Sequence, residues 1–159
     1  MAISGVTFQG QHVSAKDHGV LFSALLPDGV LRGCAVSLSG SSVSIGAGYL
    51  IACGRVIEFE TASSVAVTGT QYSQIVLTIS TTGPTFTLSC VNSSSTTFPA
   101  LTQEDLNDGV STTYQLELAV IDVAGAEIVS SIGSVALPIR IVDAVPTSAA
   151  PDGIYLVKE

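Results

Sequence analysis

The sequence predicts an all-β protein: an antiparallel β-sandwich or open barrel with one short N-terminal helix and a C-terminal extended appendage. Two observations lead to this fold class. Apolar residues alternate with polar ones through most of residues 30–132, which is the period of strands with one buried face, and glycine-containing turns separate these stretches. The chain also holds 21 Ser and 15 Thr, which suit solvated strand faces and turns, whereas charged residues make up only 11%.

The segment 39–60 is the predicted centre of the domain. Gly54 separates two strands there, and the second one places Ile57 and Phe59 on its buried side. A shift of one residue would move both side chains into water, so the tight reversal sets the register. The first strand is predicted to run without interruption through residues 42–51, because apolar residues take every second position: Val43, Ile45, Ala47, Tyr49 and Ile51.

One short helix is predicted before the strands. Ser14 and Asp17 have the spacing of a capping box, in which each residue satisfies a backbone N–H group of the other. Leu26-Pro-Asp-Gly29 ends the helix, and Gly19 is expected to weaken it by about 1 kcal/mol relative to Ala. Apolar residues recur at helical spacing between these limits: Val20, Leu21, Ala24 and Leu25.

Further strands are predicted within residues 30–39, 65–67, 72–80, 85–90, 112–123 and 127–132. Thr102 and Asp105 carry a second capping signal, which predicts a turn or one to two turns of helix within residues 101–109. Most Phe and Tyr side chains, including Phe86, are predicted to belong to the core because they fall on the apolar side of alternating strands. In the strand at 112–123, four residues are predicted to face inward: Tyr114, Leu116, Leu118 and Val120.

Two parts are predicted along the chain. Residues 1–136 form a β-rich core domain with an N-terminal arm and the helix, and residues 137–159 form an extended appendage or a terminal strand pair. Residues 1–13 are expected to lie as an arm or an edge strand. Apolar residues in the arm and the appendage stand outside the main series of hairpins, so we expect them to contact other subunits by strand addition to a sheet edge. These candidate intersubunit contacts are Val6, Phe8, Ile139, Ile141, Ile154, Tyr155 and Leu156.

The charge of the chain disfavours two classes of partner. Five basic residues stand against thirteen acidic ones, for a net charge of −8. The basic residues are scattered, so we expect no nucleic acid partner, and the same sign disfavours an anionic membrane. No apolar run approaches the ~18 residues of a membrane span, so we expect no membrane insertion.

The N-terminus and the cysteines indicate synthesis in a reducing cytoplasm. The first residues have neither the basic nor the apolar region of a signal peptide, so we expect none. The three cysteines are Cys34, Cys53 and Cys90, all in apolar, strand-like surroundings. We expect buried reduced thiols, with one disulfide plus a free thiol as the alternative.

No motif indicates catalysis, a metal or a cofactor. Gly46-Ala-Gly48 lacks the third glycine and the helix of a dinucleotide-binding motif, so it is expected to permit a bulge or a close approach of strands. His12 and His18 lack metal-ligand spacing to each other and to the cysteines. We therefore expect no enzyme and no cofactor. Three clustered carboxylates are expected to accept hydrogen bonds from N–H groups at a helix start: Glu104, Asp105 and Asp108.

Several phrases of the sequence resemble small tail or baseplate proteins of bacteriophages and prophages, in particular those of Gram-positive hosts. They are VSAKDH at 13–18, LRGC at 31–34, IGAGYLIACGRVI at 45–57, and LTQEDLN at 101–107 followed by TYQLELA at 113–119. The segments IVDAVPTS at 141–148 and GIYLV at 153–157 are similar to a short element that recurs in phage tail-fibre and baseplate proteins. The resemblance covers most of the chain, and it rests on packing and turn phrases rather than on catalytic motifs.

The resemblance implies a non-enzymatic virion structural protein that assembles as a homo-oligomer and joins the tail to fibres or receptor-binding proteins. Longer relatives carry a receptor-binding extension, so we expect any receptor-binding tip to be a separate polypeptide here. The alternative from another class is a carbohydrate- or receptor-binding module of a tail fibre. A cell-wall hydrolase is disfavoured, because it needs a pair of carboxylates in a cleft and charged residues are scarce.

Overall fold

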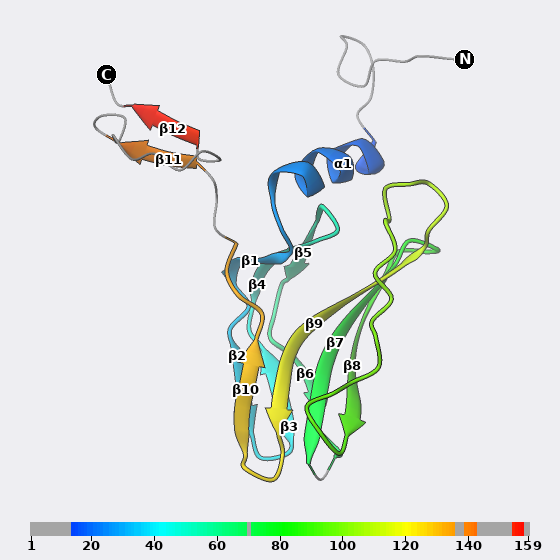
Figure 1. Cartoon of the computed structure of the whole chain (residues 1–159), viewed down its shortest axis with the longest axis vertical. Coiled ribbons are helices and arrows are strands. Elements are labelled where there is room, and N and C mark those ends of the chain that lie inside the picture. The colour runs from blue at the N-terminus through cyan, green and yellow to red at the C-terminus, as the bar shows by residue number, and fades with distance from the viewer. Residues whose placement is uncertain (1–13, 70, 136–138, 143–153, 158–159) are drawn as a thin grey trace.

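The computed structural model describes residues 14–69, 71–135, 139–142 and 154–157, and it confirms the all-β fold class (Figure 1). Within these residues, one short helix precedes twelve strands, and three sheets are antiparallel. The strands of these sheets surround one core of buried apolar residues. The elements are α1 (Ala15–Leu25), β1 (Gly29–Gly33), β2 (Val36–Ser39), β3 (Ser42–Ile45), β4 (Gly48–Ala52), β5 (Arg55–Phe59), β6 (Ser63–Ala66), β7 (Tyr72–Ser80), β8 (Thr85–Ser93), β9 (Thr113–Asp122), β10 (Glu127–Ser131), β11 (Ile139–Val142) and β12 (Ile154–Val157).

The first half of the strand region is a long hairpin that bends in the middle. β2 pairs with β3 near the hairpin turn, and β1 pairs with β4 beyond it, but the two pairs belong to different sheets. The uninterrupted strand predicted for residues 42–51 is therefore wrong. The chain breaks at Gly46 and Ala47, and the buried face changes there: Leu50, predicted to face solvent, is fully buried.

Close backbone contact causes this bend. A Cβ atom added at Gly48 would lie 2.2 Å from the carbonyl oxygen of Arg32, and one added at Gly33 would lie 2.2 Å from that of Ala47. Only glycines let the two arms approach so closely, which confirms the role predicted for the Gly46–Gly48 phrase. Cys34 N–H donates to Ala47 across the bend at 3.1 Å. Strands that turn a corner in this way pass from one sheet of a sandwich to the other.

The predicted hairpin around Gly54 is confirmed. β4 and β5 pair from Gly48–Phe59 to Ala52–Arg55, leaving Cys53 and Gly54 as a two-residue turn. Both turn residues have positive φ, 47° and 69°, which is the backbone of a type I′ turn. The side chains of Ile57 and Phe59 are buried, as predicted. The strand predicted near residues 65–67 is β6, which pairs with β3.

The second half forms a four-stranded sheet in the order β10-β9-β7-β8. β8 ends opposite Tyr72 and β9 begins opposite Ser80, at the other end of β7. The segment 94–112, which connects β8 to β9, must therefore run back along the sheet. Thr102 of this connection accepts a hydrogen bond from the backbone N–H of Gln115 in β9 at 2.7 Å. Since β7 lies between β8 and β9, the connection crosses one face of β7. This explains why β7 is buried on both faces.

The predicted inward face of β9 needs correction. A β-bulge shifts the pairing of β7 with β9, so that Val76 lies opposite Glu117 and Ile75 opposite Ala119. The bulge changes the inward face, and Val120 is not part of the main core cluster, contrary to the prediction, whereas Leu116 and Leu118 are. Within residues 101–109 the structure has a turn, which is the first of the two predicted alternatives.

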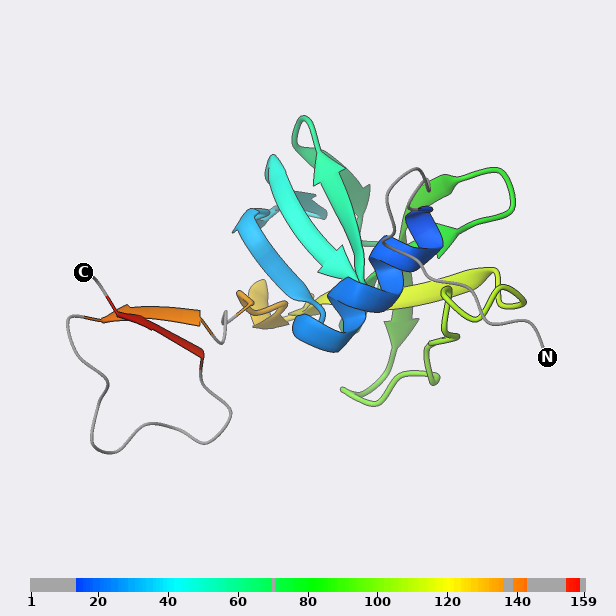
Figure 2. The ribbon, with the colours of Figure 1, turned by 90° about the horizontal axis from the view of Figure 1, so that it is seen from above.

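The two halves enclose the core without closing completely. β2 contacts β10 on one side, and β6 contacts β8 on the other. β5 and β8 are each the last strand of their sheets, so they face one another as unpaired edges (Figure 2). The arrangement is thus a barrel-like sandwich with one open seam, between β5 and β8.

The helix α1 lies at one end of this sandwich (Figure 1). The predicted capping box is present, with Ser14 Oγ accepting the N–H of Asp17 at 3.1 Å and the carboxylate of Asp17 accepting the N–H of Ser14 at 3.0 Å. Gly19 is the buried residue of the helix, and it faces the body. In contrast, the apolar side chains of Val20, Leu21 and Leu25 are about half exposed.

The segment after residue 138 contains the predicted strand pair. β11 and β12 pair in parallel, with Ile139 opposite Ile154 and Ile141 opposite Leu156. Figure 1 shows this two-stranded sheet set apart from the other three.

Candidate interaction site

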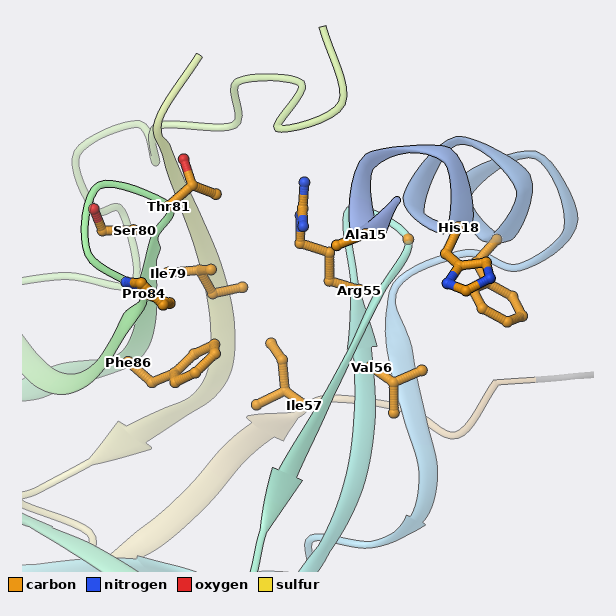
Figure 3. A pocket seen from close by; sticks show the side chains of 12 residues that line it. Ala15, His18, Arg55, Val56, Ile57, Ile79, Ser80, Thr81, Pro84 and Phe86 are labelled. Carbon is orange, nitrogen blue, oxygen red and sulfur yellow. The ribbon is translucent and has the colours of Figure 1, made fainter. Parts of the chain in front are cut away.

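A cavity of about 500 Å³ lies where α1 meets the open seam. Its wall is mainly apolar and comes from α1, from β5 and from the β7–β8 hairpin. In Figure 3 the side chains of Phe86 and Ile57 point toward one another, whereas Val56 and His18 lie on the opposite face of β5. The cavity therefore follows the free edge of β5.

A second cavity of about 460 Å³ continues along the same seam. It shares Ile57 and Phe86 with the first, and it runs between β5–β6 and β8 as far as Ser64. Its rim includes the carboxylates of Glu58 and Glu60. We call the two cavities together the seam cleft. Each has the size of a typical ligand site.

Exposed apolar side chains occur on the elements that form the walls of the seam cleft. Among the nine large apolar residues that are exposed in the described part of the chain, Val56 and Phe86 line the cleft itself, and Val20, Leu21 and Leu25 lie on α1. The side chain of Phe86 is 57% exposed, although the sequence predicts it in the core. Exposed apolar surface beside a groove marks an interaction site in soluble proteins.

One face of α1 continues the apolar surface of the cleft. His18, Leu21, Phe22 and Leu25 are spaced i, i+3, i+4 and i+7, so they form one stripe along the helix. His18 and Phe22 line the cavity, while Leu21 and Leu25 are exposed beside them. The stripe and the cleft therefore form one surface.

A buried polar junction holds α1 in place above the cleft. Asn107, only 5% exposed, donates its side-chain amide to the carbonyl of Cys53 at 3.1 Å and to the hydroxyl of Ser23 at 3.3 Å. Arg55 donates to the carbonyl of Leu106 at 2.9 Å. One amide thus joins the helix, the β4–β5 turn and the segment before β9, and it positions one wall of the cleft.

Asp28 forms a second link between the same parts of the fold. Its carboxylate accepts the backbone N–H of Cys53 at 2.8 Å and the hydroxyl of Tyr114 at 2.5 Å. Burial, followed by this hydrogen bond to Asp28, raises the pKa of the Tyr114 phenol well above its ordinary value of 10.0. The phenol therefore stays protonated and acts as a structural donor.

All three cysteines are free thiols, but only Cys34 is buried as expected, whereas Cys53, in the β4–β5 turn, and Cys90 are half-buried. Burial raises the pKa of both Cys34 and Cys53 above the ordinary value of 9.0. For Cys53 the N–H of Leu106 acts in the opposite direction, and the nearby carboxylate of Asp105 adds to the rise. Because the thiolate is the nucleophile, neither side chain is activated at neutral pH.

The predicted carboxylate cluster caps turns instead of a helix start. Asp108 accepts the N–H groups of Val110 and Ser111 at 2.6 and 2.7 Å, and its pKa is lowered by these hydrogen bonds. Asp105 accepts the N–H of Asn107 at 2.9 Å. Across residues 14–135 apart from residue 70, and in β11 and β12, no group of three or more His, Cys, Asp or Glu side chains is placed to hold a metal ion.

The predicted contact residues fall into two groups. Val6 and Phe8 lie outside the described residues, as does His12. Ile139 and Ile141 lie on β11, and Ile154, Tyr155 and Leu156 lie on β12, so the strand pairing brings these five together. His18 is exposed at the mouth of the cleft.

The seam cleft is not predicted by the alternation of apolar and polar residues. The position of Phe86, just after the Thr82-Gly-Pro84 turn, could have indicated the cleft. At the end of a hairpin, few neighbouring residues are present to cover a large side chain. Alternation alone assigns Phe86 to the buried face, and which strand covers that face is a tertiary property.

The fold and the seam cleft define this chain as a small all-β domain, barrel-like and open along one side. No protein-family model matches the chain, and no curated protein matches it either. Among the described residues, α1 is the one helix, and it is too short to cross a membrane.

Proposed function

We propose that this protein is a non-enzymatic structural component of a bacteriophage or prophage tail or baseplate. It assembles as a homo-oligomer in the virion and connects the tail to fibres or receptor-binding proteins. The phrases quoted from the sequence support the phage assignment, and the geometry of the chain's C-terminal strands supports assembly.

The parallel pairing of β11 with β12 is the observation that carries the proposal. Within the described residues, neither strand pairs with any other strand. Parallel sheets occur almost only where both faces are covered, and a two-stranded sheet is marginally stable in water on its own. The residues of these strands are mostly apolar, IRIV and IYLV. A pair of this kind is completed by further strands, and copies of the same chain supply them in a homo-oligomer.

Light scattering of the purified protein tests the assembly. We expect a discrete oligomer at tens of micromolar, and a smaller mass when either Ile141→Lys or Leu156→Lys places a charge in the strand pair. Val110→Lys is the matched control, because Val110 is 84% exposed in a loop and carries the same change of charge. Thermal unfolding of the variants checks that the core is intact. A monomeric parent protein would contradict the homo-oligomer.

Mass spectrometry of phage particles tests the virion assignment. Particles released after prophage induction in the bacterium that carries the gene are expected to contain this chain together with other tail proteins. Its absence from purified tails would contradict the assignment, whatever the oligomeric state.

A second candidate function is a carbohydrate- or receptor-binding module of a tail fibre. The exposed ring of Phe86 at a cavity of ligand-site size favours it. Glycan-array screening of the parent protein and of Phe86→Ala tests this function. A glycan bound by the parent protein and lost in the variant would place it ahead of the structural role.

A further inference from the structure

We propose that the seam cleft of each copy receives the N-terminal arm of a second copy, residues 3–8, as an added β-strand. This inference rests on the proposed homo-oligomer and adds a second contact between its subunits, beside that of β11 and β12.

The free edges on the two sides of the cleft suit strand addition. β8 pairs along its nine residues with β7, so its other edge has no strand partner among residues 14–135, and β5 likewise pairs with β4 alone. Free strand edges present unpaired N–H and C=O groups that bind an extended segment, while pockets beside them accept alternate side chains. The seam cleft supplies such pockets at Ile57 and Phe86, which both of its cavities share.

The N-terminal arm has the composition that this cleft requires. Val6 and Phe8 are apolar and flank Thr7, so an extended arm places both on one side. Residues 1–13 contain no Asp, Glu, Lys or Arg, although the chain as a whole has a net charge of −8. The arm therefore enters an apolar cleft without desolvating a charged side chain, which would be costly.

The point of attachment and the length of the arm also fit. Ala15 and His18, in the first turns of α1, line the cavity, so the arm joins the body at the mouth of the cleft. Thirteen extended residues span up to about 43 Å, whereas the five residues of β5 span about 17 Å. An arm that leaves one cleft therefore reaches the cleft of an adjacent copy.

A second copy accounts for more of the exposed surface than the arm alone. One added strand in the cleft leaves the stripe of α1 with Leu21 and Leu25 uncovered, because these residues lie beside the cavity rather than in it. A neighbouring body seated on α1 covers the stripe while its arm fills the cleft. Exchange of identical elements between copies is a common route to oligomers.

Tryptophan fluorescence provides a direct test, because the chain contains no Trp. Phe86→Trp places one indole in the cleft, and light scattering confirms that this protein has the mass of the parent. We expect the emission to shift to longer wavelength when Phe8→Asp is added, because the indole becomes exposed to water. Thr7→Asp is the matched control, with the same charge on the opposite side of the arm, and is expected to leave the emission unchanged. Val56→Trp provides a second reporter in case Phe86→Trp does not fold.

Dilution separates the arm of a second copy from the arm of the same chain. We expect dilution to shift the emission of the Phe86→Trp protein at the same concentrations at which its mass falls to that of a monomer. An emission shift caused by Phe8→Asp but not by dilution to monomer would assign the arm to its own chain and overturn the proposal. If the protein is an oligomer and Phe8→Asp leaves the tryptophan emission unchanged, the docking of the arm is wrong but the homo-oligomer is not. A monomer at every concentration would instead contradict the homo-oligomer itself.

Discussion

A Cβ atom added to Gly19 would lie 2.0 Å from Oδ1 of Asn107, so the helix α1 rests on this buried amide through a glycine. The turn residue Gly54 lies equally close on the same side, where an added Cβ atom would be 2.0 Å from the carbonyl oxygen of Gly19. By helix propensity alone, Gly19 is expected to weaken the helix. In the folded protein its missing side chain is what lets α1 pack against the β4–β5 turn.

Gly19→Ala is therefore expected to destabilise the protein, although alanine has the higher helix propensity. Overpacking of this kind costs about 1–3 kcal/mol, more than the ~1 kcal/mol that propensity returns. Asn107 cannot turn aside freely, because its amide bonds to Ser23 and Cys53. The free energy of unfolding in urea provides the measurement.

The variant Asn107→Ala completes this test as a double-mutant cycle. In its background, Gly19→Ala no longer meets an amide and is expected to be neutral or stabilising. Equal losses from Gly19→Ala in both backgrounds would show that the clash with Asn107 is not the cause.

Two phenylalanines are expected to respond differently to truncation. Phe59 is 9% exposed in the core, so Phe59→Ala is expected to lower the free energy of unfolding by about 3–5 kcal/mol. Phe86 is 57% exposed in a single copy, so Phe86→Ala is expected to cost the monomer less than about 1 kcal/mol. Chemical denaturation of the two variants, at a concentration at which light scattering gives the mass of a monomer, measures both values. A loss of several kcal/mol for Phe86→Ala under these conditions would mean that its own chain covers the ring.

The hydrogen bond between Tyr114 and Asp28 is expected to make stability depend on alkaline pH. The folded state raises the pKa of Tyr114 above the ordinary value of 10.0, first through burial and then through Asp28. This contribution is therefore fully present below about pH 10, and it is lost as pH rises further. Unfolding measured at pH 8 and at pH 10.5 is expected to show a loss in the parent protein.

Tyr114→Phe removes this contribution and is expected to reduce the alkaline loss, while the thiols of Cys34 and Cys53, whose pKa is also raised, keep their own share of it. Since the hydrogen bond joins a neutral donor to a carboxylate, its removal is expected to cost about 1–2 kcal/mol at pH 8. Tyr72→Phe is the matched control, because it removes a hydroxyl group from the adjacent strand β7. The prediction fails if both variants retain the alkaline loss of the parent.

The capping box predicts the opposite dependence in acid. Hydrogen bonds from the side chain and the backbone N–H of Ser14 lower the pKa of Asp17 below its ordinary value of 3.8. A lowered folded pKa stabilises the helix start above about pH 3.8, and this contribution is lost as pH falls through the folded pKa. An NMR titration of the Asp17 carboxyl measures the shift. Ser14→Ala is expected to return the pKa toward 3.8, and an unchanged value would exclude the capping box as its cause.

Local pattern was sufficient for the elements whose cause lies within a few residues. The Ser14–Asp17 cap, the turn at Gly54 and the alternation along residues 72–80 each identify an element that the structure contains. In these places neighbouring residues decide the backbone geometry. The deciding feature is a side chain that accepts a nearby N–H, a glycine at positive φ, or the alternation of apolar and polar side chains at every second residue. The all-β fold class follows from their sum.

The sequence by itself therefore determined the kind of protein: its helix, most of its strands and the apolar character of its C-terminal strands. Only the tertiary structure decided where the long strand bends at Gly48, which face of β9 is inward after the bulge, and that Phe86 is exposed at an open seam. Each of these depends on contact between segments far apart in the chain. Alternation tells which residues share a face of a strand, but what covers that face depends on which other strand lies against it.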